Sequence, residues 1–219
     1  MLRLRAPTKP IWLETVLGDF TTFLQDHAAN ERKAAQSALQ LVAHYPDRRE
    51  LVEKMLEVAR EELEHFDDTY RRLAADQRRL AFDRPDPYMG ALHRWMRKGK
   101  VAESLLDRML VFSVVEARGC ERFFMLANAF RDGAVPGGGG DNCAESDSSR
   151  ADPNRANPGG ETLAEFYRRL AESEGRHQGC FHALAYLYFP REEVDARIAD
   201  VLSAEAIIFD GLKIRPALH

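Results

Sequence analysis

Cysteine is scarce in this chain of 219 residues, and its arrangement excludes several kinds of metal site. The three cysteines, Cys120, Cys143 and Cys180, are an odd number and form no Cys-x-x-Cys pair. A zinc ribbon or a rubredoxin-type iron site needs such pairs, so both are disfavoured. An odd number of cysteines without such a pair suits a reducing compartment. We expect Cys120 and Cys180 to be small core residues and not ligands.

Long apolar runs and a strong charge imbalance are also missing. No run of 18 apolar residues occurs, and the N-terminal stretch MLRLRAPTKP has no apolar signal core. We therefore expect neither membrane insertion nor export, and we place the chain in the cytoplasm. The net charge of -4 argues against a general polyanion-coating protein but allows a local basic patch. The length is sufficient to bury a core, and we expect a single domain over residues 1–219.

What the sequence does contain is helical periodicity. Apolar residues recur every three or four positions through four long segments, which predicts amphipathic helices that bury one face. The long segments span residues 19–45, 47–76, 101–131 and 161–189, with shorter helices at 11–17 and 89–97 and a further helix from residue 191. Residues 132–160 are rich in glycine, so we expect a flexible loop insertion there. The predicted fold class is all-α, a four-helix bundle with additional flanking helices.

Two copies of the motif Glu-x-x-His interrupt the apolar faces of these helices. Glu62 and His65 lie in the stretch REELEHF, and Glu174 and His177 lie in AESEGRHQG. A spacing of three places both side chains on one helix face, which here is the face predicted to be buried. A single copy is more often a surface pair than a ligand pair. Two copies on buried faces favour a dinuclear metal site.

Single glutamates occupy the matching positions of the other two long helices. Glu31 and Glu116 each stand in the middle of an otherwise apolar stripe. Where their partner helices carry histidine three residues later, these helices carry Ala34 and Gly119. Small residues there either leave room for oxygen and substrate or simply pack the helices closely. His27, one turn before Glu31, is either a partner of that carboxylate or a hydrogen-bonded core histidine, and we favour the second interpretation.

The positions of the turns place all four glutamates at one level of a bundle. Glu31 lies 15 residues before Pro46 and Glu62 lies 16 residues after it. In an antiparallel hairpin both are then about 23 Å from the turn. Glu116 and Glu174 are level by the same argument. The long connection between the hairpins can return the chain along the bundle, and two hairpins joined by one crossover are the ferritin-like layout.

Buried at one level, four ionised carboxylates without partners would each cost several kcal/mol. Two divalent cations compensate this charge, and carboxylates with one imidazole per ion suit iron or manganese. The six candidate metal ligands are Glu31, Glu62, His65, Glu116, Glu174 and His177. An iron-storage relative would need a closed shell, of which there is no sign, and a rubrerythrin-type carrier would need a cysteine-rich iron module. A di-manganese catalase or another iron-binding or iron-oxidising protein stays open as an alternative.

Five stretches give the sequence a more specific resemblance. They are LRLRAPT, LQDHAANERKAAQSAL, ELEHF, VVEARGCERF and LAEFYRRLAESEGRH. With them, nearly the whole chain except residues 132–160 resembles the bacterial tRNA 2-methylthio-N6-isopentenyladenosine hydroxylase family. The resemblance implies a ferritin-like, non-haem di-iron monooxygenase that uses two iron ions and O2 to hydroxylate the isopentenyl group at position 37 of tRNA. It also implies that the six candidates bind iron, Glu31 and Glu116 as terminal ligands, Glu62 and Glu174 as bridges.

A tRNA substrate should leave an electrostatic trace. Residues 78–100 hold seven arginines and lysines against two aspartates, a net charge of +5. Basic residues on a solvated crossover often serve only solubility. With the resemblance, we expect Arg94, Arg97 and Lys98 to contact RNA phosphates. We also expect a monomer that receives electrons from an external donor of the ferredoxin or reductase type.

Overall fold

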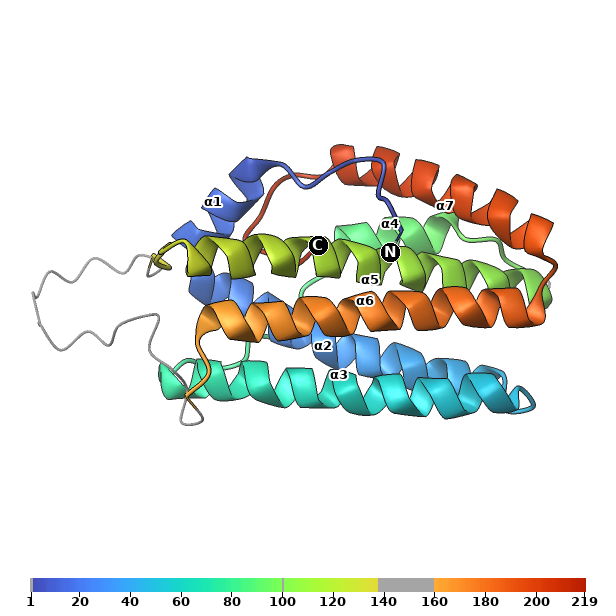
Figure 1. The fold of residues 1–219 in the computed structure, drawn as a ribbon, viewed down its shortest axis with the longest axis horizontal. Coiled ribbons are helices and arrows are strands. Elements are labelled where there is room, and N and C mark those ends of the chain that lie inside the picture. The colour runs from blue at the N-terminus through green and yellow to red at the C-terminus, as the bar shows by residue number, and fades with distance from the viewer. Residues whose placement is uncertain (1, 100, 138–159) are drawn as a thin grey trace, which may run out of the picture.

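The computed structural model describes residues 2–99, 101–137 and 160–219, and the regular structure in these ranges is entirely helical. The helices are α1 (Pro10–Gly18), α2 (Phe20–His44), α3 (Arg49–Ala75), α4 (Pro87–Trp95), α5 (Val101–Arg131), α6 (Leu163–Tyr188) and α7 (Arg191–Asp210). The four long helices α2, α3, α5 and α6 form the body of the molecule, and the others lie against them (Figure 1). The predicted helices differ from these only at their ends.

Local signals in the sequence set several helix ends. The Asp19 side chain caps α2 by accepting a hydrogen bond from the backbone N–H of Thr22 at 3.2 Å. Thr162 and Glu165 form a reciprocal capping box at the start of α6. Pro46 follows α2 in the turn, where its missing N–H and its ring prevent the helix from continuing. These ends fix how far each helix runs before the chain reverses.

The long helices pair as two antiparallel hairpins. α2 packs along α3, and α5 packs along α6 (Figure 1). The segment that contains α4 joins the hairpins, which contact each other chiefly through α3 and α6. α7 lies over α5 and also contacts α4. The prediction of an all-α four-helix bundle with flanking helices is confirmed.

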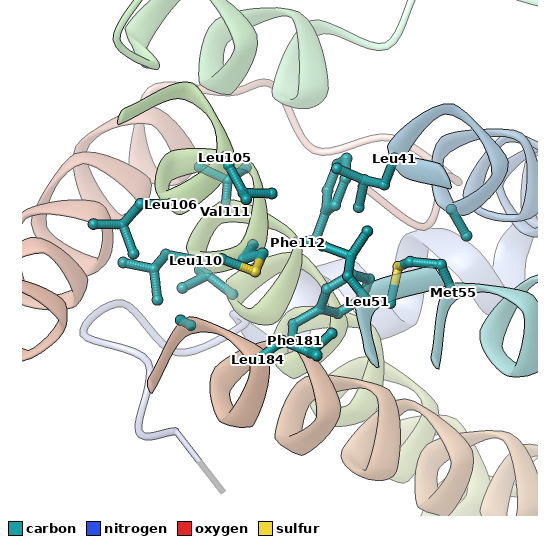
Figure 2. Packing of buried hydrophobic residues seen from close by; sticks show 14 of the residues in the cluster. Leu41, Leu51, Met55, Leu105, Leu106, Leu110, Val111, Phe112, Phe181 and Leu184 are labelled. Carbon is teal, nitrogen blue, oxygen red and sulfur yellow. The ribbon is translucent and has the colours of Figure 1, made fainter. Parts of the chain in front are cut away.

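Two apolar clusters fill the bundle on either side of its middle. Figure 2 shows part of the first, in which Leu41, Met55, Phe112 and Phe181 come from the four long helices. The second is rich in aromatic side chains and is built chiefly from α1, α2, α5 and α6. Along α2, residues of the second cluster precede Glu31 and residues of the first follow it. The level of Glu31 is therefore enclosed between two layers that exclude water.

The predicted glycine-rich insertion lies mostly outside the described residues. Of residues 132–160, the structure describes 132–137 and Gly160. The flexibility expected for this insertion stays a prediction. In the described part of the chain, no helix combines the length and the apolar character needed to cross a membrane.

Candidate metal centre

All six candidate ligands are buried at the middle of the bundle. α2 supplies Glu31, α3 supplies Glu62 and His65, α5 supplies Glu116, and α6 supplies Glu174 and His177. Their exposed fractions range from 1% for Glu62 to 8% for Glu116. The ionisable faces predicted from four separate helices thus meet in one place, out of contact with bulk water.

The donor atoms form two overlapping groups. The first group is Glu31, Glu62, His65 and Glu174, and the second is Glu62, Glu116, Glu174 and His177. Within each group the donor atoms lie within 4.8 Å of one another. Glu62 and Glu174 belong to both groups, as carboxylates that bridge two ions must. Each group adds one further carboxylate and one imidazole, so the two positions are chemically alike.

Five of the candidate donor atoms have no hydrogen-bond partner among the described residues. Both oxygens of Glu62, Oε1 of Glu174 and Nδ1 of each histidine are buried without a hydrogen bond. Nδ1 of His177 lies 2.7 Å from Oε1 of Glu62, but the angles at these two atoms do not meet hydrogen-bond geometry. Nδ1 of His65 lies 3.6 Å from Oε2 of Glu62. Each unsatisfied buried polar group costs about 1–3 kcal/mol, so a set of them aimed at two common points fits two cations.

Without ions, the cluster relieves its charge by holding protons. Burial and the charge of Glu62 raise the pKa of Glu31 well above its usual range. Burial and the charge of Glu116 do the same for the pKa of Glu174. Burial favours the neutral form of His177, but Glu62 outweighs it and raises the pKa of His177 to about 9. Divalent ions must displace these protons, so their binding weakens as the pH falls.

His27 lies behind Glu31 and contacts it directly. Nε2 of His27 is 2.6 Å from Oε1 of Glu31, and the ring is fully buried. Burial lowers the pKa of His27 to about 3, so the ring is neutral at neutral pH. Once a metal ion displaces the proton from Glu31, the Nε2–H of the ring can donate to that carboxylate. The sequence interpretation favoured a core histidine, but the ring is also a partner of the carboxylate. It stacks on Phe23 while leaving Oε2 of Glu31 to face the cluster.

Glu61 holds His177 from the other side, and the sequence interpretation missed it. Nε2 of His177 lies 3.2 Å from Oε2 of Glu61, which also accepts hydrogen bonds from Ser173 at 2.9 Å and Arg176 at 3.2 Å. Burial raises the pKa of Glu61, but Ser173, His177 and Arg176 together lower it, so this carboxylate stays ionised. A carboxylate on the far nitrogen fixes the ring so that Nδ1 faces the site. The only signal in the sequence is its position beside Glu62.

Gly119 brings α5 and α6 close together and does not leave open space. A Cβ atom at Gly119 would lie 3.4 Å from Oε2 and 3.6 Å from Cγ of Glu174. The carboxylate from α6 therefore occupies the volume that a side chain would take. Of the two interpretations of the small residue, close packing applies at this position.

The three predicted RNA contacts differ in their availability. Nη2 of Arg97 lies 2.7 Å from Oδ1 of Asp107, and the backbone N–H of Arg97 also donates to that buried carboxylate. Arg94 and Lys98 are exposed and form no ion pair with any described residue. Arg97 is therefore engaged in the fold, whereas Arg94 and Lys98 are free to meet a ligand.

Together, fold and site define a ferritin-like bundle whose core can hold two metal ions. The family described as tRNA-(MS[2]IO[6]A)-hydroxylase (MiaE) matches residues 2–135. A relative from Pseudomonas putida, tRNA 2-(methylsulfanyl)-N(6)-isopentenyladenosine(37) hydroxylase, is 32% identical over 205 residues, which are 92% of this chain and 84% of the relative. The chain belongs to the MiaE family of tRNA hydroxylases, and the resemblance seen in the sequence is confirmed.

A solved structure shares the fold over the full length. Protein 43 with aldehyde deformylating oxygenase activity, from Synechococcus, is 31% identical to this chain and matches it with a TM-score of 0.80. The match covers 100% of this chain and 96% of the other. The same helical bundle therefore serves an oxygenase that acts on a different kind of substrate, which means that residues around the centre, and not the bundle itself, must select the substrate.

Proposed function

We propose that this chain is an oxygen-dependent di-iron hydroxylase. Its substrate is the isopentenyl group of 2-methylthio-N6-isopentenyladenosine at position 37 of tRNA. The observation that carries the proposal is the pair of overlapping donor groups that share Glu62 and Glu174. Membership of a family named for a tRNA hydroxylase, and a relative named for this nucleoside, support the choice of substrate.

In this proposal the six residues bind two iron ions in distinct roles. Glu31 and His65 complete the first position, and Glu116 and His177 complete the second. Glu62 and Glu174 bridge the two. Oxygen donors with one imidazole per ion match iron(II) better than zinc or calcium. The buried donor atoms that lack hydrogen bonds are consistent with this assignment.

The chain prepares this site by holding its ligands rigidly and keeping water out. Iron bound here supplies the activation of O2 that hydroxylation of an unactivated C–H bond requires. His27 fixes one oxygen of Glu31, and Glu61 fixes the ring of His177. The two apolar clusters above and below the centre exclude water, which protects a reactive site from side reactions. One oxygen atom of O2 enters the product and the other leaves as water, which consumes two protons and two electrons, the electrons coming from a donor.

That donor is external, because the described residues offer no second redox centre of cysteines or clustered ligands beyond the six. We propose a donor of the ferredoxin or reductase type, and a monomeric enzyme that works in the cytoplasm. Size-exclusion chromatography with light scattering measures the oligomeric state directly.

For the RNA, we propose that Arg94 and Lys98 contact phosphates. Both are exposed at the C-terminal end of α4, without ion pairs among the described residues. The double replacement Arg94→Glu and Lys98→Glu should weaken tRNA binding and flatten its dependence on salt. Arg97 is left intact in this test because it is one of two arginines, with Arg197, that pair with the buried carboxylate of Asp107, so its replacement would also disturb the fold. Unaltered affinity at low salt would count against this surface.

Mass spectrometry of tRNA nucleosides tests the activity. The iron-loaded protein is incubated with tRNA that carries the prenylated, methylthiolated adenosine, with O2 and a chemical reductant. We expect a gain of one oxygen atom on that nucleoside, and none with Glu62→Ala protein. A di-manganese catalase would instead decompose peroxide with manganese bound, so a peroxide assay with metal analysis separates the alternative. No oxygen gain in the presence of full iron occupancy would reject the proposed reaction.

A further inference from the structure

A cavity opens between α2, α4 and α5, and one of its lining residues, Phe112, precedes the candidate ligand Glu116 by four positions on α5. Its volume is about 530 Å³, within the range of roughly 300–1,000 Å³ usual for small-ligand sites. It is lined by α2, by His93 of α4 and the segment that follows α4, and by the N-terminal half of α5. The hairpins meet chiefly through α3 and α6, so this cavity lies on the side where α2 and α5 pack less closely.

One residue of the cavity lining lies close in sequence to the proposed iron site. Phe112 lines the cavity and lies four residues before Glu116 on α5, which places the two side chains on the same helix face about 6 Å apart along the axis. Its ring packs on Phe181 of α6, with centroids 5.6 Å apart (Figure 2). Glu116 is the most exposed of the six candidate ligands, at 8%. An alkyl chain passing Phe112 would therefore reach the centre on the Glu116 side.

The wall of the cavity is basic. Arg108, one turn before Phe112, is only partly exposed and forms no ion pair or hydrogen bond with any described residue. Lys98 adds a second free cation at the rim. Among the described residues that line the cavity, none is acidic. A partly exposed arginine without a carboxylate partner is available to an anion, and its planar guanidinium fork suits a phosphate.

The remaining lining fits a purine base. Met96 and Phe112 offer an apolar surface on which a base or its thiomethyl group can pack. Gln40 lies on the α2 side and carries an amide that can both donate and accept hydrogen bonds. Phosphate, base and alkyl chain thus find complementary groups in the order Arg108, Phe112, Glu116 along a single helix.

We propose that this cavity receives the extruded target nucleotide, with Arg108 bound to a phosphate flanking the modified adenosine and Phe112 guiding the isopentenyl group toward Glu116. The inference rests on the proposed function and adds to it the residues that select the substrate. An enzyme that acts on a base in this way takes the base out of its stack and reads it in a fitted pocket. Arg108 here binds the substrate, and Phe112 positions it.

Calorimetric titration of the iron-loaded, oxygen-free protein tests the role of Arg108. The probes are 2-methylthio-N6-isopentenyladenosine and its 3′,5′-bisphosphate. In Arg108→Gln, the bisphosphate should bind about 10- to 100-fold more weakly, because one charge-assisted hydrogen-bonded contact is lost. The nucleoside, which has no phosphate, should bind as it does to the wild type. Arg60→Gln, at an exposed arginine of α3 that does not line the cavity, is the matched control and should change neither.

A second variant tests the role of Phe112. In Phe112→Trp, the larger ring should weaken binding of the prenylated bisphosphate, whereas adenosine 3′,5′-bisphosphate should bind as it does to the wild type. Phe112→Leu keeps this position apolar and should retain the preference for the prenylated probe. Thermal melting of each iron-loaded variant confirms that the bundle is folded. Equal weakening of both probes by Phe112→Trp would show that the alkyl chain does not pass this residue.

The outcomes separate this proposal from the proposed function. If the wild type hydroxylates tRNA but Arg108→Gln binds the bisphosphate normally, the cavity assignment is overturned and the hydroxylase function stands. If Arg108→Gln weakens binding of the bisphosphate alone, while the wild type adds no oxygen to tRNA, the cavity is supported as a nucleotide site and the proposed reaction is rejected. Equal losses for nucleoside and bisphosphate would also overturn the phosphate contact.

Discussion

Replacing His27 by phenylalanine isolates the hydrogen bond that holds Glu31. His27 is fully buried and surrounded by aromatic rings, among them Phe23 at 5.7 Å and Phe123 at 4.9 Å between centroids, so a phenyl ring preserves the packing. What is lost is the single contact of 2.6 Å from Nε2 to Oε1 of Glu31. The ring is neutral at neutral pH, and Glu31 is ionised once a metal ion binds it. In the metal-bound protein the contact is therefore a hydrogen bond to a charged group, with a contribution of about 1.5–3 kcal/mol.

This loss should appear in metal affinity. A change of about 1.5–3 kcal/mol corresponds to roughly 10- to 100-fold in the dissociation constant, which agrees with the usual effect of removing a group that orients a metal ligand. Titration with Mn(II), followed by the electron paramagnetic resonance signal of the free ion, resolves the two binding steps. We expect the affinity for the ion bound by Glu31 and His65 to fall, and the affinity for the ion bound by Glu116 and His177 to change less.

A matched control is available in His182. This histidine also stacks on an aromatic ring, Tyr186, with centroids 5.0 Å apart, but it is not among the candidate ligands or their partners. His182→Phe should leave both Mn(II) dissociation constants unchanged. If His27→Phe also leaves both unchanged, the contact with Glu31 does not support metal binding, and the reasoning about this hydrogen bond is refuted.

Three further predictions follow from the site. Glu61→Gln should weaken the ion held through His177 about 10-fold or more, measured by the same titration, and equal affinities would contradict the role of Glu61. Gly119→Leu should displace Glu174 and lower metal content per chain, whereas Gly119→Ala, with its Cβ at contact distance, should retain it; full metal content in the leucine variant would oppose this. In the ion-free protein, the raised pKa values of Glu31 and Glu174 mean that the folded state binds more protons than the unfolded state. The free energy of unfolding should therefore fall as the pH rises above the usual carboxyl range. The expected slope is about 1.4 kcal/mol per pH unit for each proton that the folded state retains. Chemical denaturation between pH 6 and 8 measures this slope, Mn(II) should reduce it, and a rising or flat profile would contradict it.

The fold and the six central residues were accessible from sequence because they depend on periodicity within single helices. Apolar stripes with a 3.6-residue period define which face is buried, and any carboxylate on that face must meet its counterparts from other helices. Two Glu-x-x-His motifs and two matching glutamates at equal distance from the turns therefore converge, as the structure shows. Their assignment as iron ligands stays a prediction.

What escaped prediction depends on contacts between helices. Glu61 faces away from the apolar stripe, and its role arises only because α6 brings His177 and Ser173 beside it. Gly119 was compatible with open space or with close packing until the position of Glu174 on the neighbouring helix decided between them. From the sequence, Arg97 was expected to be a solvated cation. The chain that follows α4 instead places it against the buried carboxylate of Asp107, with which it pairs. Long-range pairings of this kind leave no periodic signal.

Diffraction from Fe(II)-soaked crystals at the iron absorption edge locates the bound ions. Two anomalous peaks are expected in the bundle core, both in contact with Glu62 and Glu174, one next to Glu31 and the other next to Glu116. A single peak, or peaks away from these carboxylates, would contradict this expectation.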